Sequence, residues 1–331
     1  VLQAGLYLIN STITLNADAV SIIGAGSSPC DAAGGLPTTG TRLLWTGATL
    51  TGCMMLGSTP GHPIGCRYEG FSLFGGSAVG TQKAVGMRFG GGAHCSIRDM
   101  AFCNFSSVAL DMYSASGDPT DTIKGPNHFS IDNVHIDVGS LYWQAYSGMA
   151  LSPSTAIGFR NEVFDYGDFF CSTITNMFVI HNYVGVWMGN SDNNTFVGLQ
   201  TYGYPNSIGP LAVAASPQRG LFITDNSRTN RVIGCTSQVV AINNTGPSIP
   251  AQCSIYDLDV LNPGSIANAI SVATNCEVMF TVGSLFASGG AAAGDYYAGP
   301  NSGTSGLYSM TFNESLGKIS LTNRSGTVTS F

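Results

Sequence analysis

Three stretches of the chain spell nearly the same eight letters: CSIRDMAF at residues 95–102, FSIDNVHI at 129–136 and CSIYDLDV at 253–260. From the third letter onward, each stretch reads apolar, any, Asp/Asn/Gly, apolar. Seven segments share this pattern, and they begin at Tyr68, Ile97, Ile131, Ile174, Phe196, Val232 and Ile255. The steps between successive copies are 29, 34, 43, 22, 36 and 23 residues. A minimum step near 22 residues, with longer steps above it, indicates a constant unit that carries loop insertions.

A second pattern interleaves with the first and reads Gly or Ala, apolar, any, apolar. Its copies span residues 86–89, 109–112, 158–161, 185–188, 220–223, 241–244 and 269–272. Each unit therefore holds two short segments of period two, which predict strands. The Asp/Asn/Gly position predicts a bend, because those residues tolerate a left-handed backbone.

Stacked strand-bend-strand units of this length predict an all-β chain that forms a parallel β-solenoid. The charges support this register, because stacked strands bring equivalent positions to within about 4.8 Å. Glu69, Arg98 and Asp132 follow the first apolar residue in three successive units, which predicts a ladder of alternating charge on the outer face. The alternative is a β-sandwich in which the internal similarity is coincidental.

The first residues lead to a family resemblance. The stretch AGLYLINSTITLNADAVSIIGAG at residues 4–26 resembles the entry coil of the pectate-lyase-like right-handed parallel β-helices, and the resemblance covers roughly residues 1–285. That family includes polysaccharide lyases, glycoside hydrolases, epimerases and bacteriophage tailspikes, so the fold does not settle the function. The catalytic motifs of polygalacturonases and the calcium-binding aspartate cluster of lyases are not evident.

Within this family the chain looks most like a phage tailspike or tail-fibre depolymerase. The resemblance implies a homotrimer, a bacterial cell-surface polysaccharide as partner, and a place in the virion tail or outside the cell. It also implies reduced cysteines. Nine cysteines with no CxxC pair agree with that, whereas six Asn-x-Ser/Thr sequons make the opposing case for a glycosylated secreted protein.

Residues 286–331 differ in composition from the rest of the chain. A Gly/Ala/Ser-rich connection is followed by two strand-like pieces, GLYSMTF at 306–312 and GKISLTN at 317–323. We expect these pieces either to cap the open end of the solenoid or to join matching pieces in a trimer.

Composition and charge exclude several classes of partner. The net charge of −7 and the absence of a basic stripe argue against nucleic-acid binding. No apolar run reaches 18 residues, so the sequence predicts no membrane span. We expect no cofactor and no metal site. A neutral glycan fits the overall charge, and so does an acidic glycan bound by local arginines.

The second pattern places a row of polar and aromatic residues on the outer face. Its outward column reads Arg88, Asp111, Arg160, Trp187, Phe222, Asn243 and Ser271. Two residues further along the strands come Tyr113, Glu162 and Thr224. An exposed strip of this composition predicts a sugar-binding face, because aromatic rings stack on sugars while arginines and carboxylates bind their polar groups. We expect Arg88, Tyr113, Arg160, Trp187 and Phe222 to bind substrate.

Asp111 and Glu162 are candidates for the acid pair of a glycosidase. On adjacent strands with an offset of two residues, their backbones would lie about 8 Å apart, from about 4.8 Å across and about 6.6 Å along the strands. Inverting glycosidases separate their carboxyl groups by about 6.5–9.5 Å. The alternative is that Arg88, Asp111 and Arg160 form a structural charge ladder.

The longest insertion offers a competing site. It contains Tyr142, Trp143 and Tyr146, and it is followed by Glu162, Asp165 and Asp168. We expect Trp143 to bind substrate, and Asp165 and Asp168 to be further catalytic candidates if the segment forms a turn. The alternative is a solvated loop. His135 is predicted to project outward beside Ser72, Ala101 and Phe178, and a lone surface histidine is more often incidental than catalytic.

These observations predict a viral tailspike-like protein that binds and hydrolyses a bacterial surface polysaccharide. Two rivals remain open: a receptor-binding fibre or adhesin that uses the same strip without turnover, and a polysaccharide lyase. A lyase would leave unsaturated products, which a hydrolase does not.

Overall fold

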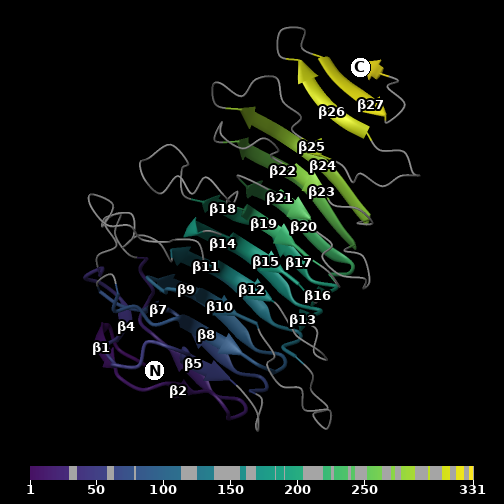
Figure 1. Ribbon diagram of the computed structural model, residues 1–331. Helices are drawn as coiled ribbons and strands as arrows, with labels where there is room; N and C mark the ends of the chain where they lie inside the picture. The colour runs from purple at the N-terminus through teal and green to yellow at the C-terminus, as the bar shows by residue number, and fades with distance from the viewer. Residues whose placement is uncertain are drawn as a thin grey trace.

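The computed structural model shows an all-β protein built from parallel strands (Figure 1). The structure describes residues 1–29, 36–57, 63–77, 80–112, 125–137, 157–161, 169–182, 184–189, 191–203, 219–224, 227–237, 240–242, 252–262, 270–272, 277–287, 297–298, 308–313, 318–323 and 328–330. No helix in these ranges is long and apolar enough to cross a membrane.

Two large sheets, which we name sheet A and sheet B, contain most of the strands. Sheet A has 13 strands: β1 (Gly5–Ile9), β3 (Ser21–Ile23), β4 (Thr41–Trp45), β6 (Arg67–Glu69), β7 (Phe71–Phe74), β9 (Ser96–Cys103), β11 (Ser130–Asp137), β14 (Thr173–Asn182), β17 (Thr195–Val197), β18 (Gln200–Gly203), β20 (Asn230–Ser237), β22 (Gln252–Asn262) and β24 (Glu277–Ala287). Sheet B has 10 strands: β2 (Ile13–Thr14), β5 (Cys53–Gly57), β8 (Val85–Phe89), β10 (Val108–Asp111), β12 (Ile157–Asn161), β15 (Val184–Met188), β19 (Arg219–Ile223), β21 (Val240–Ile242), β23 (Ile270–Val272) and β25 (Tyr297–Ala298).

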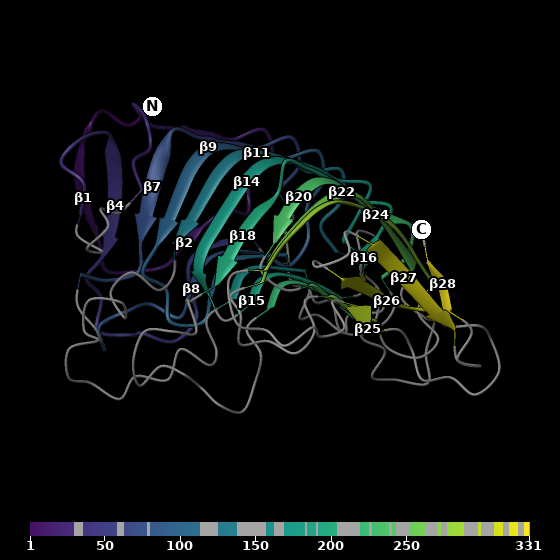
Figure 2. The same ribbon diagram turned by 90° about the horizontal axis from the view of Figure 1, so that it is seen from above.

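Along the main path of each sheet the strands lie side by side in chain order, as Figure 2 shows for sheet A, while β3, β6 and β18 lie off the path of sheet A. The chain alternates between the two sheets, so we call one strand of sheet B together with the following strands of sheet A a rung. A third row of parallel contacts lies between them in the chain. It consists of β13 (Phe169–Phe170), β16 (Ser191–Asp192) and single bridges at Ile64, Ala93, Asn127 and Arg228. This arrangement of stacked parallel sheets is compatible with a β-solenoid.

The strand register confirms the first repeated pattern in all of its copies. Its leading residues face one another in six consecutive pairs: Tyr68 and Ile97, Ile97 and Ile131, Ile131 and Ile174, Ile174 and Phe196, Phe196 and Val232, and Val232 and Ile255. The stack also extends beyond the predicted copies, because Ile22 pairs with Tyr68 and Phe280 pairs with Ile255. The opening motif therefore marks one position of a continuous stack.

The second pattern is confirmed except at its sixth copy. The expected copy at residues 241–244 would place Asn243 in the outward column. In the structure Phe222 pairs with Ala241, which in turn pairs with Ser271. The prediction of Asn243 is therefore wrong by two residues. A shift of two keeps every side chain on the same face of a strand, so the apolar alternation alone does not distinguish the two registers.

Every predicted bend residue adopts a left-handed backbone. The φ angles are 69° at Gly70, 50° at Asp99, 51° at Asn133, 52° at Asn176, 68° at Gly198, 63° at Gly234 and 55° at Asp257. Residues without a side chain, or with a short polar one, pay the smallest steric cost in this region. The bend thus falls at the same position in each of the seven copies. The steric cost of the left-handed backbone explains why the pattern has only Asp, Asn or Gly at that position.

A second column of left-handed residues lies three positions before the leading residue of the pattern. Its φ angles are 54° at Ala19, 66° at Gly65, 54° at His94, 52° at His128, 52° at Cys171, 54° at Asn193 and 52° at Thr229. We call this position the second corner. It was not predicted, although Gly65, His94, His128 and Asn193 are of residue types that favour a left-handed backbone. A β-branched residue such as Thr229 is an outlier in this region.

The interior next to this corner is polar in the middle of the stack. Asn194 Nδ2 donates to the Phe169 carbonyl at 2.8 Å and to Asn230 Oδ1 at 3.0 Å. Asn194 Oδ1 accepts from the Ser172 backbone N–H at 3.0 Å, and Asn230 Nδ2 donates to the Ser191 carbonyl at 3.1 Å. Ser172, Ser191, Asn194 and Asn230 are all buried. Their hydrogen bonds therefore replace those lost to water, and they connect neighbouring rungs.

Another part of the interior is apolar. Met, Phe, Leu, Ile and Val side chains from sheets A and B form one continuous core, with Phe71, Met87 and Ile97 among its fully buried members. Of the seven cysteines that the structure describes, six are buried. Cys171 is the exposed one. Buried thiols such as Cys95, which donates to the Pro63 carbonyl at 3.2 Å, act here as small apolar side chains.

The C-terminal strands are antiparallel. β26 (Tyr308–Asn313), β27 (Lys318–Asn323) and β28 (Val328–Ser330) form a separate three-stranded sheet, of which the sequence predicted the first two. The expected boundary after residue 285 falls within β24, and β25 still pairs with β23 of sheet B. Parallel stacking therefore continues to Ala298.

Replacing a bend residue tests the backbone constraint. We expect Asn176→Val to be less stable than Asn176→Gly by about 1–2 kcal/mol, because valine pays the full steric cost of the left-handed region. Both variants lose the hydrogen bond from Asn176 Nδ2 to Asp132, so the difference between them isolates the backbone. Urea unfolding followed by circular dichroism measures it, and equal stabilities would contradict the assignment.

Asp132 makes stability depend on pH. The hydrogen bond from the Thr175 hydroxyl, together with those from Asn176 Nδ2 and Arg98, lowers the pKa of Asp132 below its ordinary value. Its contribution is therefore complete above the unfolded value of about 3.9 and is lost as the pH falls through the folded value. We expect the melting temperature of Asp132→Asn to lie below wild type at neutral pH and to approach it in acid. A gap that does not change with pH would refute this.

Candidate functional site

The predicted outward column of sheet B contains a compact ion-pair cluster. Asp111 pairs with Arg88 on one side and with Arg160 on the other, as the register of the strands confirms. Arg88 Nε donates to Asp111 Oδ2 at 2.8 Å, while Arg160 Nε and Nη2 donate to Asp111 Oδ1 and Oδ2 at 3.0 and 2.9 Å. Both carboxylate oxygens are thus held by charge-assisted bonds from two neighbouring rungs.

Burial differs among these three residues. The Asp111 side chain has 0% of its surface exposed, whereas 24% of Arg88 and 17% of Arg160 remain exposed. A carboxylate without exposed surface does not contact a ligand, but the two guanidinium groups reach the surface. This geometry favours the charge-ladder interpretation of Asp111 over a catalytic one.

Two aromatic residues continue the same column. Trp187 lies partly exposed beside Phe222, with ring centroids 5.5 Å apart, and its indole Nε1 donates to Thr224 Oγ1 at 3.1 Å. Phe222 itself is only 7% exposed and packs in an apolar cluster with Val184 and Ile157. The expectation of an exposed strip is therefore wrong for Phe222 and Asp111, because an outward direction on one strand does not guarantee contact with solvent.

The remaining predicted site residues lie outside the described part of the chain. They are Tyr113, Trp143, Glu162, Asp165 and Asp168. The register of Asp111 opposite Arg160 agrees with the offset from which the acid pair was inferred. Their catalytic and binding roles remain predictions.

His135 lies where the sequence placed it. It pairs with Ala101 and with Phe178, and the rings of His135 and Phe178 have centroids 5.0 Å apart. It lies on sheet A, away from the ion-pair cluster of sheet B.

No metal site emerges from the described residues, among which no group of three His, Cys, Asp or Glu side chains is placed to hold a metal ion.

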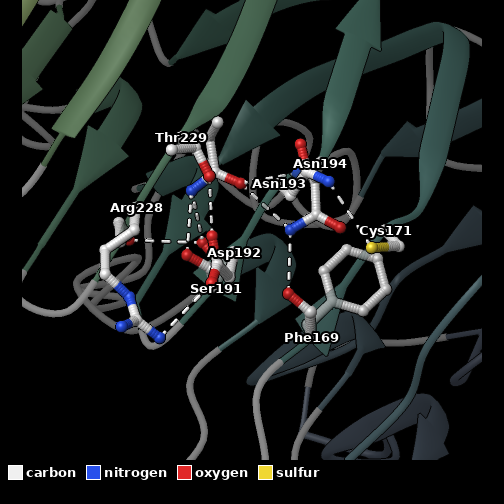
Figure 3. A network of polar contacts seen from close by, with 10 residues as sticks. Phe169, Cys171, Ser191, Asp192, Asn193, Asn194, Arg228 and Thr229 are labelled. Carbon is white, nitrogen blue, oxygen red and sulfur yellow. Dashed lines mark hydrogen bonds and ion pairs between the residues drawn. The ribbon is translucent and has the colours of Figure 1, made fainter.

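Sequence reasoning missed a group of polar surface residues at the second corner. Arg228 Nη2 lies 3.3 Å from Asp192 Oδ2, and the Thr229 hydroxyl donates to Asp192 Oδ1 at 2.7 Å (Figure 3). A signal was present, because a histidine directly precedes two of the three opening stretches, at His94 and His128. Their shared position was not recognised as a corner, although histidine is enriched in the left-handed region.

Comparisons with known proteins add little to these observations. No protein-family model matches the chain, and no curated protein sequence matches it. Among solved structures, ORF18 of Geobacillus virus E2 is similar, with a TM-score of 0.47 and 12% sequence identity. The match covers 96% of this chain and 57% of ORF18, so the chain spans little more than half the length of that viral protein.

Asp111→Asn distinguishes the structural role from the catalytic one. We expect the variant to lose about 3 kcal/mol of stability, because the amide leaves two partly buried guanidinium groups without their shared counter-charge. Thermal unfolding of the variant and of wild type measures the loss. An Asp111→Asn protein with an unchanged melting temperature and no polysaccharide cleavage would instead support catalysis by Asp111.

Proposed function

We propose that this chain is a tailspike-like protein of a bacteriophage tail that binds a bacterial surface polysaccharide on the outer face of sheet B and hydrolyses it. The observation that carries the proposal is the row of partly exposed Arg88, Arg160 and Trp187 side chains on a rigid parallel frame. We further propose that the stacked sheets close into a right-handed parallel β-helix, as the family resemblance implies.

The physical argument for binding rests on preorganisation. Bonds to buried Asp111 hold the guanidinium groups of Arg88 and Arg160 in place, so a ligand does not have to order them. Trp187 lies on the next rung after Arg160, and the hydrogen bond to Thr224 orients its indole ring. Arginine binds hydroxyl and acid groups, while an indole face stacks on the apolar face of a sugar.

Hydrolysis requires two carboxyl groups that contact the substrate. Because Asp111 is buried, we assign the acid and base to Glu162 together with Asp165 or Asp168, with Tyr113 and Trp143 as further substrate-binding residues. The sequence places these carboxylates directly after β12, which carries Arg160. That adjacency supports the assignment.

We also propose that the antiparallel strands within residues 286–331 cap the stack or join three copies. The antiparallel sheet of β26, β27 and β28 supports this, since its strand direction differs from that of sheets A and B.

A binding-only fibre is the second candidate. The burial of Asp111 favours it, because one member of the inferred acid pair has no exposed surface. In this case the same face of sheet B would bind the polysaccharide without turnover.

Product analysis on a panel of bacterial capsule and O-antigen polysaccharides separates these functions. We expect new reducing ends without the ultraviolet absorbance of unsaturated sugars, which is the result of hydrolysis. Both signals together would indicate a lyase and direct attention to Arg88 and Arg160. Binding without either signal would establish the fibre and overturn hydrolysis, and Glu162→Gln should abolish cleavage while sparing binding.

Trp187→Ala tests the binding face. We expect affinity for the bound polysaccharide to fall about tenfold, in line with the contribution of one stacked aromatic ring. Trp187→Phe is the matched control, because it keeps an aromatic face although it loses the indole N–H and one of the two fused rings. Isothermal titration calorimetry measures both, and an unchanged affinity for Trp187→Ala would rule out this face.

A further inference from the structure

Three aromatic rings occupy successive rungs at the second corner. The rings of His94 and His128 have centroids 4.9 Å apart with an angle of 30° between their planes. Phe170 follows on the next rung, with its centroid 5.7 Å from that of His128 and its plane at 73°. Both histidines are exposed and Phe170 is partly exposed. The surface therefore presents a short aromatic row along the stack.

The next rungs continue this row with polar side chains. Asn193 and Thr229 are exposed at the same corner position. The Thr229 hydroxyl donates to one carboxylate oxygen of Asp192, and the other oxygen lies 3.3 Å from Arg228 Nη2 (Figure 3). The negative charge of Asp192 is therefore paired with the positive charge of Arg228. We name the set His94, His128, Phe170, Asp192, Asn193 and Thr229 the corner strip.

A column of hydroxyl groups runs beside the corner strip. Ser130 pairs with Thr173, and Thr173 pairs with Thr195, each two residues beyond the corner residue of its rung. These side chains are exposed or partly exposed on the outer face of sheet A. On the rungs of His128 and Phe170 an aromatic ring and a hydroxyl group therefore lie on either side of the corner, and the exposed Arg231 follows Thr195 in the hydroxyl column.

The fold does not require rings at this corner. His94 and His128 adopt a left-handed backbone that glycine, as at Gly65 of the same column, adopts without a steric cost. On neighbouring rungs the interior of the corner is held by buried Ser172 and Asn194, independently of the exposed rings. The rings of His94 and His128 are therefore not needed to hold the corner, and their exposed surfaces can contact a ligand.

We propose that the corner strip is a second binding site and that it takes a neutral polysaccharide along the axis of the stack. Rings stack on the apolar faces of sugars, and the amide of Asn193 with the hydroxyl column bonds their hydroxyl groups. The rung spacing of about 4.8 Å is close to the length of one sugar unit in an extended chain, so successive sugars meet successive rungs. The inference deepens the proposed function and rests on it for the class of ligand.

The test uses the full chain and the double variant His94→Asn, His128→Asn. Asparagine tolerates the left-handed backbone, so the variant removes the ring faces and keeps the corner. His135→Asn is the matched control, because His135 also lies against a phenylalanine, Phe178, but on another part of sheet A. Affinity is measured by calorimetry against purified neutral and acidic bacterial polysaccharides, and imidazole resonances are followed by nuclear magnetic resonance.

We expect a neutral polysaccharide to shift the His94 and His128 resonances, and the double variant to bind it at least tenfold more weakly than wild type and His135→Asn do. Unchanged affinity of the double variant, with weakened binding by Trp187→Ala, would overturn the corner strip and leave the proposed function standing. The reverse pattern would establish the corner strip and overturn the site on sheet B. Failure of every neutral polysaccharide to shift these resonances would also overturn the inference.

Discussion

The whole structure depends on where the backbone turns left-handed. Six successive rungs contain two such points, one at the bend within sheet A and one at the corner before it, and both recur in register along the stack. Parallel strands pair continuously only if every rung turns at the same place, because a displaced turn moves the following side chains out of their columns. Buried Asn194 and Asn230 secure the corner from inside with bonds that run from rung to rung.

The same stacking determines what the outer surface can do. It brings Arg88, Asp111 and Arg160 together from three separate stretches of chain, and the Asp111 carboxylate forms ion pairs with both arginines. A buried charge is retained only with such compensation, so the cluster gains a rigid, partly exposed pair of guanidinium groups and loses Asp111 as an accessible acid. At the corner, stacking instead leaves rings and hydroxyl groups exposed in rows. A repeating frame of this kind suits a repeating ligand.

Prediction from the sequence succeeded where the backbone conformation allows only a few residue types. Asp99, Asn133 and Asn176 were identified as bends because few residues tolerate that conformation, and all three adopt it. It failed where several residues serve equally well. Val240 and Ile242 are both apolar with the same alternation, so the pattern selected the wrong one of two registers for β21. His94 and His128 were missed as corner residues although histidine is enriched in the left-handed region, because the residues of that column share no single type.

Taken by itself, the sequence determined that the chain is built of stacked strand-bend-strand units, which residues lead them, and which charges face one another across rungs. Local backbone preference and period-two alternation are enough for that. Only the tertiary structure decided that Asp111 and Phe222 are buried while His128 and Asn193 are exposed. Burial depends on what segments distant in the chain place over a strand, and alternation along one strand contains no information about those segments.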